Sequence, residues 1–352
     1  MEDRVSDVQE SITVTEDTRS RLRSLRLRRM SGPKDEVVGP VDSFKMPRFA
    51  GPTTFARLPT LDSVGRAEVA ILGVPFDSGV VYRPGARFGP GAIRAGSKML
   101  RAFNAWTGAE PFAHQVADAG DVACTPFGID QAIKEIEAGA VATAEKAAHL
   151  VALGGDHTIA LPLLRAAKAR FGPLALVHFD AHLDTWNTYF GGARYTHGTP
   201  FRRAAEEGLL DLERSIHVGT RGPQFSADDL PADAALGFRL IDGRAIDDRG
   251  AAAIATEIRE VVGQAQVYVS LDIDVLDPAF APATGTPEAG GWSSREAIAV
   301  IRGLGGIRIA GADVVEVAPA YDHAEITAIA AANIVFELLC LFGLDTGALG
   351  NP

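Results

Sequence analysis

Short apolar runs alternate with longer amphipathic stretches along most of the chain. From Glu68 onward, runs rich in Val, Ile and Leu are each followed by an Ala-, Glu- and Arg-rich stretch of helical period. A short β-branched run predicts a buried strand, and the longer period predicts a helix. The predicted strands are Val69–Val74, Gln115–Ala119, Leu150–Leu153, Leu174–Phe179, Ser215–Val218, Val267–Leu271 and Ala310–Val314. The predicted helices are Ile129–Ala148, Ile159–Arg170, Phe201–Glu207, Ala251–Val262, Ser294–Gly303 and Glu325–Leu341.

This alternation predicts the fold class and the domain organisation. Strands that alternate with helices are typical of βαβ units, in which helices cover both faces of a parallel sheet. No linker and no internal repeat interrupts the pattern. We therefore predict an α/β fold, a three-layer α/β/α sandwich, as a single domain over residues 41–352. Residues 1–40 are polar and Arg-rich, and we expect them to form a disordered extension.

Composition excludes several classes of protein. The 352 residues contain 34 Lys+Arg and 45 Asp+Glu, a net charge of −11, which argues against a nucleic-acid or anionic-membrane partner. No apolar run reaches the roughly 18 residues of a membrane span, and the N-terminus lacks a signal peptide's apolar segment. The two cysteines, Cys124 and Cys340, lie far apart in apolar surroundings, which excludes a disulfide framework. We expect a cytoplasmic protein in which both thiols are buried.

Acidic and imidazole groups follow three of the predicted strands. The segments are Gly154-Gly155-Asp156-His157, Asp180-Ala181-His182-Leu183-Asp184 and Asp272-Ile273-Asp274. In open parallel sheets, ligands bind beyond the carboxyl ends of the strands. Residues two apart in extended backbone point the same way, so each segment presents its polar side chains together. The three clusters are therefore predicted to meet at one edge of the sheet.

These side chains predict a metal site. Four carboxylates buried together would be prohibitively costly without cations, because like charges and desolvation both oppose ionisation. Four Asp and two His exceed what one ion needs, and they suit two divalent ions that share carboxylates. We predict two Mn2+ per subunit, with Ni2+ or Co2+ as alternatives to it. The predicted ligands are His157, Asp180, His182, Asp184, Asp272 and Asp274.

The same three segments resemble the signatures of the ureohydrolase family, which comprises arginase, agmatinase, guanidinobutyrase and guanidinopropionase. The third signature extends over Ser270–Pro278, and the resemblance covers roughly residues 40 to 345. The segments Tyr82–Pro90, Thr196–Thr199 and Asp313–Pro319 look most like the agmatinase branch. The resemblance implies an arginase-like sandwich with a mainly parallel sheet of about eight strands. It also implies a homo-oligomer, either a trimer or a hexamer.

The resemblance further implies a role for each site residue. One Mn2+ would be bound by His157, Asp180, Asp184 and Asp272, and the other by Asp180, His182, Asp272 and Asp274. The two ions would activate a water molecule for attack on the guanidinium carbon. Asp184 would relay a proton to the leaving amine, and His197 would exchange protons with solvent. Glu316 and His197 would contact the substrate, with Glu316 paired to the guanidinium. The products would be urea and an amine.

The choice of guanidino substrate rests on the loop from Thr185 to His197. Its first residues lack the polar pattern expected for arginine, and Trp186 with Tyr189 could form a cation–π wall for the ammonium of agmatine. Arg194, if it faces the pocket, would instead favour a carboxylate such as 4-guanidinobutyrate. We predict an agmatinase, with guanidinobutyrase as the first alternative and guanidinopropionase or guanidine hydrolase behind it. A catalytically silent partner subunit is the alternative of a different class, which the complete ligand set disfavours.

The remaining polar residues carry no ligand spacing. We expect Asp156 and Asp277 to orient backbone and ligands. Gly85, Gly89 and Gly91 are expected to shape a wall of the site. The other histidines are assigned to structure or surface; they are His114, His149, His178, His217 and His323.

Overall fold

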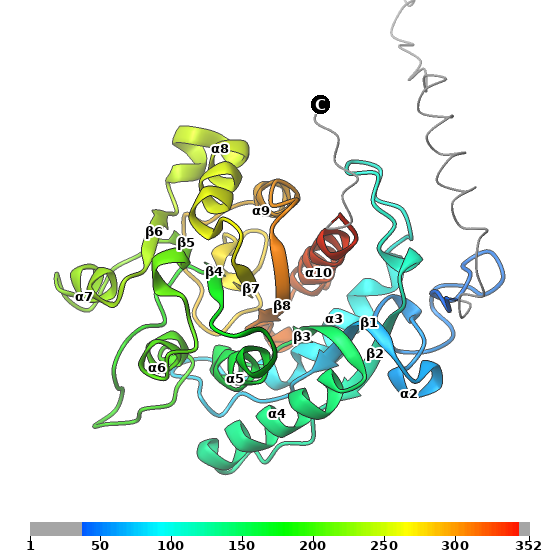
Figure 1. The fold of residues 1–352 in the computed structure, drawn as a ribbon, viewed down its shortest axis with the longest axis horizontal. Coiled ribbons are helices and arrows are strands. Elements are labelled where there is room, and N and C mark those ends of the chain that lie inside the picture. The colour runs from blue at the N-terminus through cyan, green and yellow to red at the C-terminus, as the bar shows by residue number, and fades with distance from the viewer. Residues whose placement is uncertain (1–36, 345–352) are drawn as a thin grey trace, which may run out of the picture. The chain divides into compact units, whose positions relative to one another are not determined.

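A parallel sheet occupies the middle of the fold (Figure 1). The protein is described as a computed structural model over residues 37–344. In these residues the sheet has eight strands in the order β2-β1-β3-β8-β7-β4-β5-β6, and all neighbours are parallel. The strands are β1 Ala67–Gly73, β2 Val116–Asp121, β3 Ala147–Leu153, β4 Ala175–Phe179, β5 Ile216–Thr220, β6 Arg239–Asp242, β7 Gln266–Asp272 and β8 Arg308–Val315.

Helices cover both faces of this sheet. They are α2 Leu61–Val64, α3 Gly89–Gly96, α4 Ile129–Ala144, α5 Ala160–Phe171, α6 Pro200–Glu206, α7 Asp229–Leu236, α8 Ala245–Val262, α9 Ser294–Arg302 and α10 Ile326–Leu344. Helices α4 and α5 lie on one face, and α8, α9 and α10 lie on the other (Figure 1). Along β3, Val151 and Leu153 point into the core under α8, α9 and α10, whereas Ala152 points into the core under α4 and α5. The predicted three-layer α/β/α class is confirmed.

The predicted elements differ from the observed ones mainly where burial is weak. Strand β6 lies at an edge of the sheet with Arg239 exposed, so its sequence lacks a continuous apolar run. Helix α7 contains Pro231, and α3 is rich in glycine; neither has a strong helical pattern. Helix α3 packs tightly on α10, since a Cβ on Gly96 would lie 2.8 Å from the carbonyl oxygen of Ala328.

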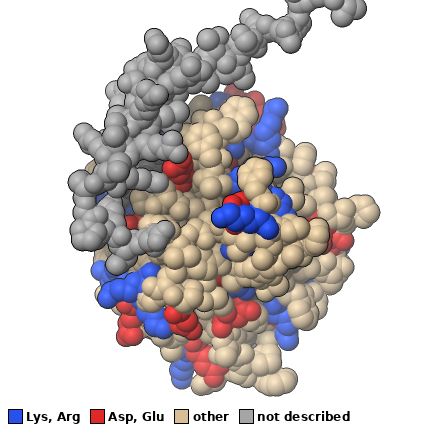
Figure 2. All heavy atoms as spheres, turned by 90° about the vertical axis from the view of Figure 1, so that its right-hand side faces the viewer, with Lys and Arg blue, Asp and Glu red and all other residues tan. Residues whose placement is uncertain are grey.

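The predicted N-terminal extension lies almost entirely outside the described residues, and the described residues 38–344 belong to one compact unit. Both cysteines are free; Cys340 is buried as expected, but Cys124 is only half-buried. No helix within residues 37–344 is long and apolar enough to cross a membrane. Figure 2 shows the side of the molecule that lies on the right in Figure 1, where basic and acidic side chains are interspersed.

The strand order brings the polar segments together. Strands β3, β8, β7 and β4 are consecutive neighbours in the middle of the sheet. Because all four run in the same direction, the segments that follow them emerge at the same edge. Residues far apart in the sequence therefore line one site.

Candidate metal centre

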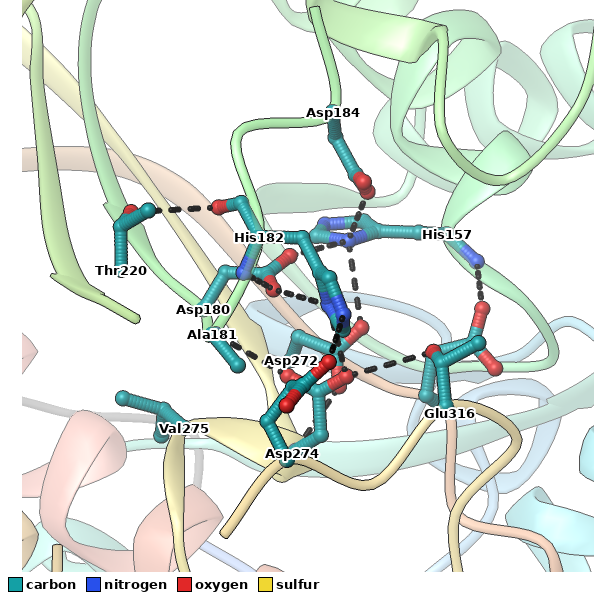
Figure 3. A network of polar contacts seen from close by, with 12 residues as sticks. His157, Asp180, Ala181, His182, Asp184, Thr220, Asp272, Asp274, Val275 and Glu316 are labelled. Carbon is teal, nitrogen blue, oxygen red and sulfur yellow. Dashed lines mark hydrogen bonds and ion pairs between the residues drawn. The ribbon is translucent and has the colours of Figure 1, made fainter. Parts of the chain in front are cut away.

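The six predicted ligands lie together at this edge (Figure 3). His157 opens the turn after β3, Asp180 to Asp184 follow β4, and Asp272 ends β7 just before Asp274. All of them are buried except His182, which is partly exposed. The structure thus gathers these side chains from three strands.

Two groups of ligand atoms share Asp180. In the first group, His157 Nδ1 lies 2.9 Å from Asp184 Oδ2, 3.2 Å from Asp180 Oδ2 and 3.4 Å from Asp272 Oδ2. In the second group, His182 Nδ1 lies 3.2 Å from Asp180 Oδ1 and 3.1 Å from Asp274 Oδ2. Asp180 therefore offers one oxygen to each group, which is the geometry of a carboxylate shared between two ions.

The backbone fixes these carboxylates. Asp180 Oδ1 accepts a hydrogen bond from the His182 amide at 2.5 Å, and Asp272 Oδ1 accepts one from the Asp274 amide at 2.8 Å. Asp184 and Glu316 have positive φ values of 53° and 65°, a region that residues other than glycine rarely adopt. Such strain persists where the surrounding structure imposes it, and it concentrates at functional sites.

The electrostatics of the cluster call for cations. Burial, reinforced by Asp274 and Asp180, raises the pKa of Asp272 well above its usual range. Burial and the Asp180 charge raise the pKa of Asp274 to about 6. His157 Nδ1 is buried without a hydrogen-bond partner and faces carboxylate oxygens. Hard oxygen donors with two imidazoles and no thiolate fit divalent ions of the Mn2+ type, which would remove the repulsion between the carboxylates.

The stabilisation gained from added metal is expected to grow with pH. A carboxyl group whose pKa is raised in the folded state lowers the free energy of unfolding of the protein as the pH rises above 3.8, the pKa of this group in the unfolded chain. For Asp274 this loss develops between about pH 4 and 6, and a bound cation would replace the proton. We expect the metal-induced rise in Tm to be about 3 °C larger at pH 8 than at pH 5, since about 1.4 kcal/mol of the loss falls between these pH values. Calorimetry of the chelated and Mn2+-loaded protein at both pH values checks this, and an equal gain at both would contradict it.

Two further sets of hydrogen bonds position His157 and Asp180. His157 Nε2 lies 2.8 Å from Ser270 Oγ, which donates to Asp313 Oδ1 at 2.6 Å. His178 Nε2 lies 2.8 Å from Asp180 Oδ2, and its ligand atoms belong to the first group. His178 was expected at a structural or surface position, and its spacing of two residues from Asp180, which puts both side chains on one side of the strand, is the local signal for this contact.

Glu316 and His197 form a pair beside the cluster. Glu316 Oε1 accepts a hydrogen bond from the His157 amide at 2.8 Å and lies 2.9 Å from His197 Nδ1. His197 Nε2 accepts from the Val81 amide at 3.1 Å, so Nδ1 is the nitrogen that donates to Glu316. Glu316 Oε2 is buried and has no hydrogen-bond partner. Within the described residues no donor satisfies this buried oxygen.

A cavity of about 310 Å³ opens next to the cluster. Its lining includes the polar residues Asp184, Asp272, His182 and His197 and the aromatic residues Trp186 and Tyr189. Phe225 and Glu288, which the sequence did not single out, also line it. No spacing marks these two residues, because they reach the cavity from the loops after β5 and β7.

Arg194, which was expected to contact the substrate if it faced the pocket, is not among the residues that line this cavity. Its side chain is 58% exposed and its Nη2 lies 3.1 Å from Glu206 Oε2. Its guanidinium lies at the surface beside this carboxylate of α6. Asp156 and Asp277, in contrast, accept backbone hydrogen bonds as expected, from Gly79 and from Gly290 respectively.

This fold and this site together define a binuclear-metal hydrolase of the α/β class. The chain belongs to the arginase family, whose model matches residues 67–341. It is 43% identical to a guanidinobutyrase from Pseudomonas aeruginosa, over 86% of this chain and 96% of that protein. It is 42% identical to a mitochondrial agmatinase from Gallus gallus, over 84% of this chain and 86% of that protein.

The solved structure of proclavaminate amidinohydrolase from Streptomyces clavuligerus superposes with a TM-score of 0.82 at 42% identity. The match covers 85% of this chain and 100% of the Streptomyces protein. The arginase family consists of binuclear metal enzymes. The protein is accordingly a hydrolase that cleaves a carbon–nitrogen bond of a linear amidine.

Proposed function

We propose that the protein is an agmatinase, which hydrolyses agmatine to putrescine and urea. The observation that carries this proposal is the lining of the cavity. The aromatic residues Trp186, Tyr189 and Phe225 and the acidic residue Glu288 line the same cavity, and the lining residues in the described part of the chain include no Lys or Arg. Aromatic faces and a carboxylate attract an ammonium group and repel a carboxylate.

The metal assignment follows the two groups of ligand atoms. We propose that the first Mn2+ is held by His157, Asp180, Asp184 and Asp272, and the second by Asp180, His182, Asp272 and Asp274. The short distances within each group and the buried hard donors support this assignment. When bound, the ions supply Lewis acidity that activates water for attack. Ni2+ and Co2+ remain the alternatives, to be compared by metal content and turnover.

Glu316 orients the guanidinium in this proposal. Its Oε1 is fixed by the His157 amide and by His197, while its unpartnered Oε2 accepts from the guanidinium nitrogens. Asp184, which lines the cavity, relays a proton to the amine nitrogen as the carbon–nitrogen bond breaks. His197 lies on the cavity wall and exchanges protons with solvent. Water and agmatine are thereby converted to urea and putrescine.

The test is urea release by the Mn2+-loaded protein in parallel assays, repeated with Ni2+. The substrates are agmatine, 4-guanidinobutyrate, 3-guanidinopropionate, arginine and guanidine. We expect kcat/KM to be at least about tenfold higher for agmatine than for the other substrates. This factor corresponds to the free energy of one hydrogen bond to a charged group. Preference for 4-guanidinobutyrate would favour a guanidinobutyrase, the activity for which one relative is named. No urea with metal bound would contradict the substrate class, and failure to bind metal would favour a silent partner subunit.

Arg194→Ala is the control variant for this assay. Arg194 is exposed and paired with Glu206, and such surface pairs contribute little. The ratio of kcat/KM for agmatine and 4-guanidinobutyrate is expected to change by less than about twofold. A larger change would assign Arg194 to substrate selection after all.

We also propose a homo-oligomer, a trimer or a hexamer, in the cytoplasm. Large aromatic side chains at Phe44, Phe49 and Trp106 are exposed and would be covered by a neighbouring subunit. Two free thiols suit a reducing compartment. Light scattering should give the mass of three or six chains, and a monomer would contradict this part of the proposal.

A further inference from the structure

Helix α7 presents two carboxylates to the loops around the cavity. Asp229 and Asp233 are four residues apart and therefore lie on the same face of the helix. Asp233 is buried and Asp229 is partly buried. Neither residue belongs to the six proposed ligands or lines the cavity itself, so their polar contacts need another explanation.

Asp229 joins two walls of the cavity. Its Oδ2 accepts hydrogen bonds from the Phe225 amide at 2.8 Å and from Trp186 Nε1 at 3.3 Å. The Trp186 ring packs edge-on against Phe225 with the centroids 5.4 Å apart. Trp186 follows β4 and Phe225 follows β5, so this single carboxylate fixes the positions of aromatic groups from two separate loops.

Asp233 starts a chain of contacts that ends at a proposed metal ligand. Its Oδ1 accepts from Thr185 Oγ1 at 2.6 Å and lies 3.3 Å from His217 Nε2. His217 Nδ1 lies 2.7 Å from His178 Nδ1, and both rings are fully buried. His178 Nε2 in turn lies 2.8 Å from Asp180 Oδ2.

The direction of the two hydrogen bonds at His178 follows from the acceptor at one end. An ionised carboxylate only accepts, so His178 Nε2 donates to Asp180 and its Nδ1 accepts from His217 Nδ1. His217 Nε2 makes no hydrogen bond within the described residues, so the 3.3 Å approach of Asp233 Oδ1 is a charge contact with the ring and not a further hydrogen bond. Partners of this kind orient a metal ligand and set its tautomer or charge distribution.

We propose that Asp229 and Asp233 are two positioning residues on one helix with separable effects. Asp229 positions the aromatic wall that receives the distal end of the substrate. Asp233, through His217 and His178, positions the Asp180 carboxylate that two metal ions would share. This inference rests on the proposed function for the identity of the substrate, but the effect on metal affinity does not depend on which guanidine is hydrolysed.

The test compares Asp229→Ala and Asp233→Ala with the wild type. For each, Mn2+ affinity is measured by titration of the chelated protein, kcat and KM are measured at saturating Mn2+, and Tm is recorded. Asp229→Ala is expected to raise KM about tenfold, the loss of a charged hydrogen-bond acceptor, with Mn2+ affinity unchanged. Asp233→Ala is expected to weaken Mn2+ binding about tenfold, with KM changed by less than about threefold.

Asp228→Ala is the matched control, since Asp228 precedes α7 and its exposed side chain makes no capping hydrogen bond. It should leave all of these quantities unchanged. Asp229→Asn and Asp233→Asn keep the shape of each side chain, and an amide oxygen can still accept from the Trp186 and Thr185 donors. Each Asn variant should restore KM or Mn2+ affinity at least halfway, in free energy, from the Ala value to the wild-type value. If an Ala variant does not fold, the Asn variant is compared with the wild type instead.

A purely structural role would look different. Both Ala variants would then lower Tm and kcat together, while KM and Mn2+ affinity stayed at wild-type values, and this result would overturn the inference. If the wild type prefers another guanidine, KM is measured for that substrate. The proposed agmatinase activity would then fail while the separation between the two variants could still hold.

Discussion

Asp272→Ala is expected to lower kcat by about a thousandfold and to reduce the metal content of the purified protein. Asp272 is buried at the end of β7, and its Oδ2 lies 3.4 Å from His157 Nδ1 within the first group of ligand atoms. The variant removes a carboxylate that we assign to both ions, so metal binding and catalysis should fail together. Metal analysis of the dialysed protein and urea release by the same sample check both effects.

The control for this variant is Asp248→Ala. Asp248 is an exposed carboxylate near the start of α8, away from the cluster. Its removal changes the net charge by the same amount and should affect neither quantity by more than about twofold. If Asp272→Ala retained both its metal and its turnover, the binuclear assignment would be wrong.

Glu316→Gln is expected to lower kcat/KM for agmatine by about a hundredfold or more and to leave the metal content unchanged. The amide keeps the size of the side chain and can still accept hydrogen bonds from the His157 amide and from His197 through its oxygen. The group that replaces Oε2 is then a donor, which faces the guanidinium with a hydrogen instead of a lone pair. Urea release and metal analysis on one preparation separate this effect from that of Asp272→Ala.

Glu325→Gln is a closely matched control. Glu325 is also a glutamate with positive φ, at 60°, but it is exposed before α10. The same chemical change at a similar backbone conformation should leave kcat/KM within about twofold of the wild type. An unchanged kcat/KM in Glu316→Gln, with metal bound, would refute the role of Glu316 in substrate binding.

Local sequence predicts the strands and the segments that follow them because both signals are local. A buried parallel strand requires a run of apolar residues such as Leu174–Phe179, and a break in that run marks where polar side chains begin. The three segments ending in His157, Asp184 and Asp274 are each contained within a few residues. Their residue types were therefore sufficient to predict a site for divalent cations at one edge of an α/β sheet.

Weakly buried elements could not be predicted from local sequence in this way. Strand β6 is short and lies at the edge, and α7 contains Pro231 and is largely exposed. Neither has the apolar period from which buried elements are predicted. Because α7 was not predicted, the roles we infer for Asp229 and Asp233 had no place in the sequence interpretation.

The sequence by itself determined the α/β class and the six side chains that we propose as metal ligands. Only the tertiary structure decided which strands are neighbours, and hence the 3.2 Å approach of His157 Nδ1 to Asp180 Oδ2. It also placed Phe225 and Glu288 in the cavity and held Arg194 at the surface. The physical reason is that strand pairing and loop contacts depend on packing between segments far apart in the chain. A periodic pattern of apolar residues predicts which face of an element is buried, but it does not predict which other element packs against that face.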